Sequence, residues 1–471
     1  MSKEKQEKKK KEFKLPTAYT ILLALTAVIA LITQVIPGVQ SSSLSDVVMA
    51  PINGMNDAID IVLFVIFIGG FLGIVTATGA LDAGVGAIVK KLKGKELMLI
   101  PVLMFIFSLG GTSYGMAEET IAFYALITTT MMVAGFDPIV SVGTIMLGAG
   151  CGVLGSTVNP FLVGASMDAL ASVGVEVNQG IVIALSTALW LSSLLVSIYF
   201  VMSYAKKVKA NPQATLLSEA EMEEAKKAHL SANADEIEFT GKRKGILAIF
   251  FITFAVMVVS VIPWESFGIN IFANTDFLTG ASLGNWWFGE LSIWFALMAI
   301  IIGLIAGMKE KEIVNNFMIG ASDMIGVALV LGISRGVSVI MSSTGLDGYL
   351  LSQASGILSD VSPLVFVNMS YIIYIGLSIL VPSTSGLANI SMPIFGPLTQ
   401  SLGFSPELVI AVFSAGSGIV NLVTPTSGVV MGGLAVAKVE YSTWLKFVGK
   451  VLLAIFISSV IVLSVGMMIL V

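Results

Sequence analysis

The chain has 471 residues, of which 56% are hydrophobic and only 12% are charged, whereas about a quarter of the residues of a soluble domain are charged. This composition, with a mean hydropathy of +0.95, excludes an ordinary soluble domain. The formal net charge of -5 decides little, because the placement of Lys and Arg, not the total charge, orients a membrane protein. Runs of about 20 apolar residues recur along the chain, which indicates membrane-spanning helices and not the strands of a barrel. The predicted fold class is an all-α multispanning membrane protein.

The chain begins with a basic segment, residues 1–18, which we expect to be cytoplasmic. No small-residue cleavage site follows the first apolar run promptly, so this run is predicted to be a retained helix. Two long apolar stretches, 97–134 and 363–402, are interrupted by polar residues and are predicted to be re-entrant hairpins, which enter and leave the membrane on one side. Nine crossings are predicted, at residues 19–37, 55–80, 139–170, 180–204, 245–263, 290–307, 322–344, 406–438 and 444–471.

The positive-inside rule sets the orientation of this layout. Every Lys and Arg except Arg335 falls on one side, which is therefore predicted to be the cytoplasm of a bacterial cell. The N-terminus is then cytoplasmic and the C-terminus extracytoplasmic. In the cytoplasmic linker, residues 205–244, Ser218 followed by Glu221 predicts the start of a short helix with a solvated charged face. The lone histidine of the chain, His229, lies in this linker and has no predicted role.

The segments on either side of the linker repeat. Residues 19–204 and 290–471 form the two repeats, and residues 245–289 supply a linking span and an outer loop. Trp286, Trp287 and Trp294 are interpreted as an interfacial belt on the outer side. Residues 56–79 align with residues 322–345 at an offset of 266, and the later blocks follow in the same order. Because corresponding helices are predicted to cross in opposite directions, this is an inverted-topology repeat, each copy with one hairpin and one broken crossing.

Four polar interruptions, at residues 112–115, 155–160, 383–386 and 421–428, join Gly with hydroxyl or amide side chains. Irregular backbone is tolerated at membrane depth only where protein or a water-filled cavity satisfies it. A broken helix turns its positive N-terminal end toward anions, while freed carbonyls hold cations, so these interruptions predict the site of a secondary transporter. The predicted substrate-binding residues are Thr112, Ser113, Glu118, Asn159, Arg335, Ser383, Thr384, Ser385, Asn389, Thr424 and Thr426. Candidates for holding a coupling cation or proton are Glu119, Ser156, Thr157 and Asn421.

Intramembrane charges are costly and mark function. Adjacent helix positions diverge by about 100°, so one of Glu118 and Glu119 is expected to face the site, and the sequence does not say which. The alternative is that the acid satisfies the helix N-terminus. Arg335 either binds a substrate carboxylate or pairs with a buried acid such as Glu118 or Asp57.

The hairpin "GGTSYGMAEETIAF" and the crossing "GCGVLGSTVNPF" resemble the anaerobic C4-dicarboxylate carrier family of the ion transporter superfamily. The N-terminal "FKLPTAYTILL" resembles its YfcC-like branch, which includes arginine/ornithine antiporters. The resemblance implies a homodimer whose subunits each have a scaffold and a transport region that moves like an elevator. The tips read Thr-Ser-Tyr and Ser-Thr-Ser where sodium-coupled dicarboxylate carriers have Ser-Asn-Thr, which argues against strict sodium coupling.

An Arg side chain and helix N-terminal ends suit a carboxylate, and Glu suits an amine. An extra acid therefore fits a basic amino acid. The expected function is therefore exchange of amino acids, such as arginine for ornithine, across the cell membrane. The alternative is a proton- or sodium-coupled carrier of C4-dicarboxylates or other organic acids. An enzyme is not expected, because no span carries a His for Ser/His catalysis and no His and Cys set could hold zinc. The expected partners are a small-molecule substrate, the bilayer and a second copy of the chain; neither nucleic acid, a metal nor a cofactor is expected, apart from Na+ or H+ as coupling ion.

Overall fold

The computed structural model describes residues 18–81, 83, 84, 87, 95–230, 239–261, 264–267, 269–359, 361–381 and 383–470. Throughout these ranges the regular secondary structure is helical, and the described residues contain no strand. The all-α fold predicted from the sequence is confirmed. The predicted basic N-terminus and most of the lysine-rich loop at 90–95 lie outside the described residues.

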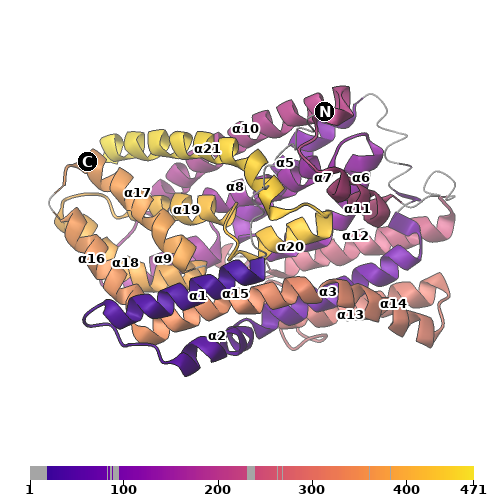
Figure 1. Cartoon of the computed structure of the whole chain (residues 1–471), viewed down its shortest axis with the longest axis horizontal. Coiled ribbons are helices and arrows are strands. Elements are labelled where there is room, and N and C mark those ends of the chain that lie inside the picture. The colour runs from indigo at the N-terminus through magenta and orange to yellow at the C-terminus, as the bar shows by residue number, and fades with distance from the viewer. Residues whose placement is uncertain are drawn as a thin grey trace, which may run out of the picture.

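The helices run in two groups along the chain (Figure 1). The first group comprises α1 (Ala18–Val35), α2 (Leu44–Asp57), α3 (Ile59–Ala77), α5 (Leu99–Tyr114), α6 (Ile121–Val133), α7 (Pro138–Val142), α8 (Gly148–Leu154), α9 (Ala165–Ala171) and α10 (Gln179–Ala210). After α11 (Glu219–His229) and α12 (Gly241–Val261), the second comprises α13 (Phe288–Ala306), α14 (Glu310–Asp323), α15 (Ile325–Thr344), α16 (Leu346–Leu358), α17 (Pro363–Leu380), α18 (Thr384–Ser401), α19 (Glu407–Asn421), α20 (Gly428–Ala437) and α21 (Tyr441–Leu470).

Seven helices in the described part are long and apolar enough to cross a membrane, or up to 8 if the bent pair α14 and α15 forms one span. Two of the seven, α5 and α17, are first arms of the predicted hairpins. The predicted crossings 139–170 and 406–438 are each built from shorter helices on either side of a break. Length and composition do not separate a hairpin arm from a crossing, so the nine crossings and the domain boundaries stay predictions.

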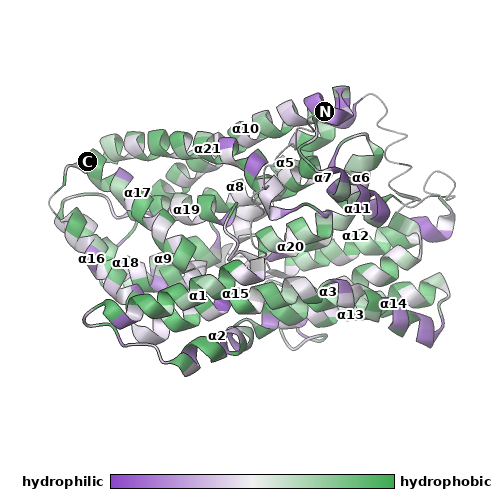
Figure 2. Cartoon of the chain, viewed as in Figure 1, coloured by the Kyte–Doolittle hydropathy of each residue, from purple (hydrophilic) through white to green (hydrophobic). Residues whose placement is uncertain are grey.

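Helices α16, α17 and α18 lie together at the side of the molecule where the C-terminus lies (Figure 1). Helices α6, α11 and α14 lie at the opposite side (Figure 1). Hydrophilic residues gather at that opposite side, and the hydrophobic residues cover the helices between (Figure 2). There Lys242 donates to the carbonyl of Ala306 at the end of α13 (2.6 Å), and Arg243 donates to the carbonyl of Thr78 after α3 (3.3 Å). Cations favour helix C-termini, so the start of α12 holds both helix ends.

Two helix pairs, each broken at one residue, pack against each other. α2 and α3 meet at Ala58, and α14 and α15 meet at Met324. Because α3 packs against α14 while α2 packs against α15, the two pairs run antiparallel. Sequence reasoning missed α2 and α14, since Pro51 and the charged first turn of α14 hide their helical pattern. The predicted spans 55–80 and 322–344 therefore begin inside these helices.

Glycines let the crossing helices touch through their backbones. A Cβ on Gly320 would lie 2.1 Å from the carbonyl oxygen of Gly69, and a Cβ on Gly336 would lie 2.6 Å from that of Ala50. Overpacking of this kind costs about 1–3 kcal/mol, so Gly320→Ala is expected to lower the thermal unfolding midpoint of the purified protein. Gly376→Ala in α17 is the control, because no atom lies within 4 Å of its added Cβ. Equal midpoints for the two variants would contradict this account.

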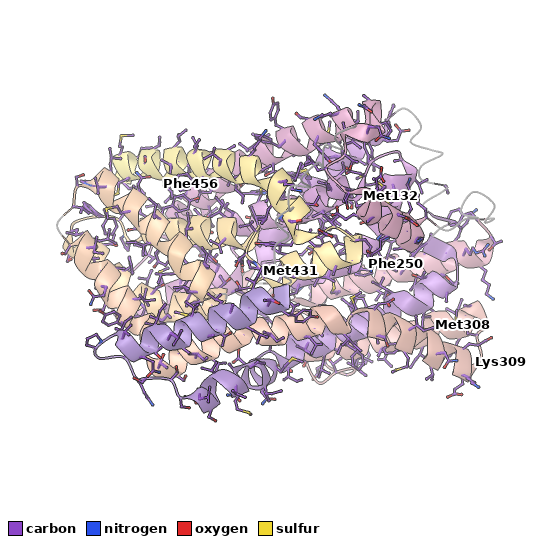
Figure 3. All side chains as sticks on the ribbon, in the orientation of Figure 1. Met132, Phe250, Met308, Lys309, Met431 and Phe456 are labelled. Carbon is purple, nitrogen blue, oxygen red and sulfur yellow. The ribbon has the colours of Figure 1, made fainter. Side chains whose placement is uncertain are left out.

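Buried apolar side chains form two clusters. The smaller one joins α3, α12, α13 and the bend before α15, and it includes Phe250, which is labelled in Figure 3. There the ring of Phe71 stacks on that of Phe250, with ring centroids 5.8 Å apart. The larger one joins α5 to α10 with α15 to α21. The candidate site described below lies where elements of both clusters meet.

The linker helix α11 begins with the capping box predicted from Ser218 and Glu221. The predicted solvated face does not include every polar residue of the helix, because Glu221 and His229 are buried. Glu221 accepts the backbone N–H of Glu440 (3.0 Å), and the Nε2 of His229 lies 3.0 Å from the carbonyl oxygen of Val436 in α20. α11 is thereby docked on the segment that joins α20 to α21.

This docking is expected to weaken in acid. Burial lowers the pKa of His229 from its usual 6.5, with nearby Lys438 acting in the same sense. The pKa of Glu221 is also lowered: burial opposes this, but hydrogen bonds from Ser218, the Glu440 N–H and Thr443 outweigh it. Both docked groups hold protons less tightly than free ones, so their contribution is complete above about pH 6.5 and is lost as the pH falls, first through His229.

We therefore expect amide hydrogen exchange in α11, corrected for the intrinsic rate, to be faster at pH 5.5 than at pH 7.5. His229→Gln is the matched control and should remove most of the step between these two values. A step of unchanged size in His229→Gln would assign it to another group.

Candidate functional site

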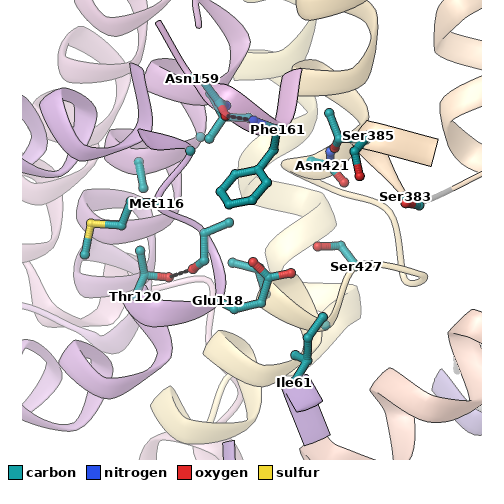
Figure 4. A pocket seen from close by; sticks show the side chains of 18 of the residues that line it. Ile61, Met116, Glu118, Thr120, Asn159, Phe161, Ser383, Ser385, Asn421 and Ser427 are labelled. Carbon is teal, nitrogen blue, oxygen red and sulfur yellow. Dashed lines mark hydrogen bonds between the residues drawn. The ribbon is translucent and has the colours of Figure 1, made fainter. Parts of the chain in front are cut away.

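A cavity of about 200 Å³ opens where the tips of the two predicted hairpins and the two helix breaks meet (Figure 4). Its lining comes from both groups of helices. Its polar side chains are Glu118, Thr120, Asn159, Arg335, Ser383, Thr384, Ser385, Asn421, Thr426 and Ser427. Apolar lining comes chiefly from Met116, Phe161, Trp287, Phe288, Leu291 and Ile61.

The connection between α5 and α6 brings a carboxylate to the cavity. α5 ends at Tyr114, and Gly115 turns the chain with a left-handed φ of +82°, a conformation that favours glycine. A short loop then leads to Glu118, which begins the single turn before α6. The turn falls at Gly115, the last residue of the predicted tip 112–115, because α5 continues through Tyr114.

The second group brings two helix N-termini to the same cavity. Ser383 caps α18, and its side chain accepts the N–H of Gly386 at 3.2 Å. Ser427 caps α20 and accepts the N–H of Val430 at 3.5 Å. The free N–H groups and partial positive charge of such ends attract carboxylates. One wall of the cavity therefore suits an anionic group.

Glu118 and Arg335 both line the cavity and are both partly exposed. The ion pairs found among the described residues are Lys209–Glu96, Lys227–Glu223 and Lys438–Glu224. Neither Glu118 nor Arg335 belongs to one, and Arg335 is likewise not paired with Asp57. The cavity thus presents one side chain of each charge without a salt bridge between them in the described part of the chain.

The backbone freed by the breaks is satisfied by neighbouring side chains. Thr112 donates to the carbonyl of Gly155 (2.6 Å), and its own carbonyl accepts the N–H and hydroxyl of Thr157 (3.0 and 3.1 Å). In the second break, Tyr441 donates to the carbonyl of Val423 and Trp444 to that of Leu422. Such partners are what irregular backbone in a membrane needs.

The predicted site residues divide accordingly. The cavity brings together Glu118, Asn159, Arg335, Ser383, Thr384, Ser385, Asn421 and Thr426. The other described side chains lie outside its lining: Ser113 donates to Leu109 within α5, Ser156 to Val153, and Thr424 bonds to Thr426, while Asn389 is exposed on α18. Thr112 and Thr157 tie the hairpin to the break. The side chain of Glu119 lies outside the described residues.

Sequence reasoning missed the aromatic part of the lining. Phe161 follows Pro160 directly at the end of the first break, and an aromatic residue in that place was a usable signal. Trp287 was interpreted, with Trp286 and Trp294, as part of an interfacial belt; instead Trp286 is buried and Trp287 lines the cavity. Among the described residues, no group of three or more His, Cys, Asp and Glu side chains is placed to hold a metal ion.

Comparison with known proteins decides the family. The model of the C4-dicarboxylate anaerobic carrier family matches residues 18–468. The chain belongs to this family. It is therefore a membrane transporter of the kind that carries small molecules across a lipid bilayer, and the family assigned by resemblance from the sequence is confirmed.

Two relatives align with this chain over most of its length and most of their own. An uncharacterized protein of Haemophilus influenzae is 32% identical over 409 residues, which cover 86% of this chain and 75% of that protein. YfcC of Escherichia coli strain K12, whose name proposes a basic amino acid antiporter, is 29% identical over 423 residues, covering 87% of this chain and 78% of YfcC.

Two solved transporter structures are also similar. MtrF of Neisseria gonorrhoeae, described as one of a class of antimetabolite efflux pumps, is 16% identical with a TM-score of 0.43 and covers 96% of this chain and 95% of its own. YdaH of Alcanivorax borkumensis is 16% identical with a TM-score of 0.41 and covers 95% of this chain and 96% of its own.

Proposed function

We propose that this carrier exchanges basic amino acids, such as arginine for ornithine, across the bacterial plasma membrane. The observation that carries the proposal is the pair of unbridged charges in one cavity, Glu118 and Arg335. An amino acid has a carboxylate and an ammonium group, and a basic one has a further cation. Arg335 with the N-termini of α18 and α20 suits the carboxylate, and Glu118 suits a cation.

The architecture supports movement of one body against another. The cavity takes Phe161 and Asn159 from the first break, and takes Trp287, Phe288 and Leu291 from α13, whose buried residues belong to the smaller apolar cluster. A substrate held between two separately packed bodies crosses when one slides past the other, as in an elevator. The antiparallel crossing of α2 and α3 with α14 and α15 supports the inverted repeat on which such a cycle depends. A homodimer, a cytoplasmic N-terminus and an extracytoplasmic C-terminus belong to the same proposal.

Counterflow tests the proposal. Proteoliposomes loaded with unlabelled arginine are diluted into labelled arginine, and entry is measured with and without ornithine, a neutral amino acid or succinate outside. We expect arginine to accumulate transiently and ornithine to compete. Entry of labelled succinate into succinate-loaded vesicles, with no arginine counterflow, would overturn the assignment.

A proton- or sodium-coupled carrier of C4-dicarboxylates is the second candidate. The description of the family and the two helix N-termini at the cavity favour it. A second carboxylate would, however, approach Glu118, and two carboxylates share a site only when one holds a proton. Counterflow of succinate that grows stronger in acid is the result this candidate requires.

A further inference from the structure

An aromatic pair forms one side of the cavity. Phe161 and Trp287 have ring centroids 4.7 Å apart at an interplanar angle of 50°, and both line the cavity. Phe161 follows the first helix break, where its N–H donates to Asn159 (2.9 Å), while Trp287 caps the start of α13. The contact thus joins two elements from different groups of helices. The ring of Phe161 points into the cavity between Asn159 and Glu118 (Figure 4).

Trp287 differs from four of the other five tryptophans of the chain. Trp264, Trp286, Trp294 and Trp444 each donate the indole N–H to a backbone carbonyl, which fixes them as structural residues. Trp287 has no such bond among the described residues, and 45% of it is exposed although its ring contacts Phe161 and Phe288. A large, partly open indole at the rim of a polar cavity is available to a ligand.

The chemistry of such a surface is selective. The face of an aromatic ring carries partial negative charge, so it attracts a guanidinium or ammonium group, with indole the best partner. A neutral group of the same shape gains packing but not this attraction. The nearby carboxylate of Glu118 adds to the attraction for a cation and excludes a second substrate carboxylate.

We propose that Phe161 and Trp287 form an aromatic platform that binds the cationic end of the substrate side chain next to Glu118. The platform discriminates a cationic substrate from a neutral one of equal shape. It rests on the proposed function, because it assigns a place to the side chain of a basic amino acid.

The experiment compares two competitors of labelled arginine counterflow: unlabelled arginine and citrulline, which replaces the guanidinium by a neutral urea of nearly equal shape. The wild type, Trp287→Phe, Trp287→Leu and Phe161→Leu are each measured. Phe277→Leu, in the same outer loop but 87% exposed and outside the cavity lining, is the control. The readout is the ratio of the citrulline to the arginine inhibition constant, which a change in the amount of folded protein does not move.

Cation–π attraction corresponds to about a twofold to thirtyfold preference, so Trp287→Leu is expected to reduce the ratio by a factor in this range. Trp287→Phe should retain most of the ratio, and Phe277→Leu all of it. Arginine counterflow with an unchanged ratio in both Trp287→Leu and Phe161→Leu would overturn the platform and leave the proposed function standing. Absence of arginine counterflow in the wild type would overturn both.

Discussion

Glu118→Gln is expected to weaken arginine counterflow by about tenfold to a hundredfold or more, because a hydrogen bond to a charged group contributes about 1.5–3 kcal/mol. The variant keeps the size and hydrogen-bonding shape of the side chain and removes the charge that faces the cavity. Uptake is measured over a range of arginine concentrations, so that a higher half-saturation is separated from a lower maximal rate. The loss should appear in the half-saturation.

The control for this variant is Glu407→Gln. Glu407 is a buried acid that accepts the N–H of Asn178 at 2.7 Å and lies outside the cavity lining. Its substitution is expected to reduce stability and leave half-saturation unchanged. If Glu118→Gln behaves in the same way, Glu118 serves only the helix N-terminus. If it retains arginine counterflow but loses a response to an imposed pH gradient, the side chain carries a coupling proton.

Residues that line the cavity could be located from the sequence more accurately than the surrounding helices. Residues at all four predicted interruptions reach one cavity, because broken helices need hydroxyl, amide and glycine residues that apolar spans lack. The charged residues Glu118 and Arg335 were found by the same argument, since an acid or base inside an apolar segment is costly. Ser427, which caps α20, was missed although it lies in the predicted break.

The misses have physical causes. Thr112, Ser156 and Thr157 have the composition of ligands, but a freed carbonyl needs a donor as much as a substrate does, and which of the two a hydroxyl serves depends on the fold. α2 and α14 escaped because each has only 14 residues, fewer than a span needs, and because Pro51 and the charged first turn of α14 interrupt their helical pattern. Trp287 lies far from the breaks in sequence, and its place at the cavity follows from the packing of α13 alone.

Arg335→Ala is expected to raise the half-saturation for arginine by about tenfold to a hundredfold or more, because hydrogen bonds to a charged group contribute about 1.5–3 kcal/mol. Arg335→Lys should restore part of the loss, since the ammonium keeps the charge but lacks the planar fork that binds a carboxylate through two parallel bonds.

The matched substrates for the Arg335 variants are arginine and agmatine, which is arginine without its carboxylate. If Arg335 binds the substrate carboxylate, the wild type prefers arginine as an inhibitor of counterflow, and Arg335→Ala removes this preference by weakening arginine and not agmatine. An equal loss for both compounds would show instead that the guanidinium organises α15 against α2, where the backbone of Arg335 already lies against Gly54. The double variant Glu118→Gln with Arg335→Ala separates the two charges: if they hold opposite ends of one molecule, their effects on binding add, as for sites that do not touch each other.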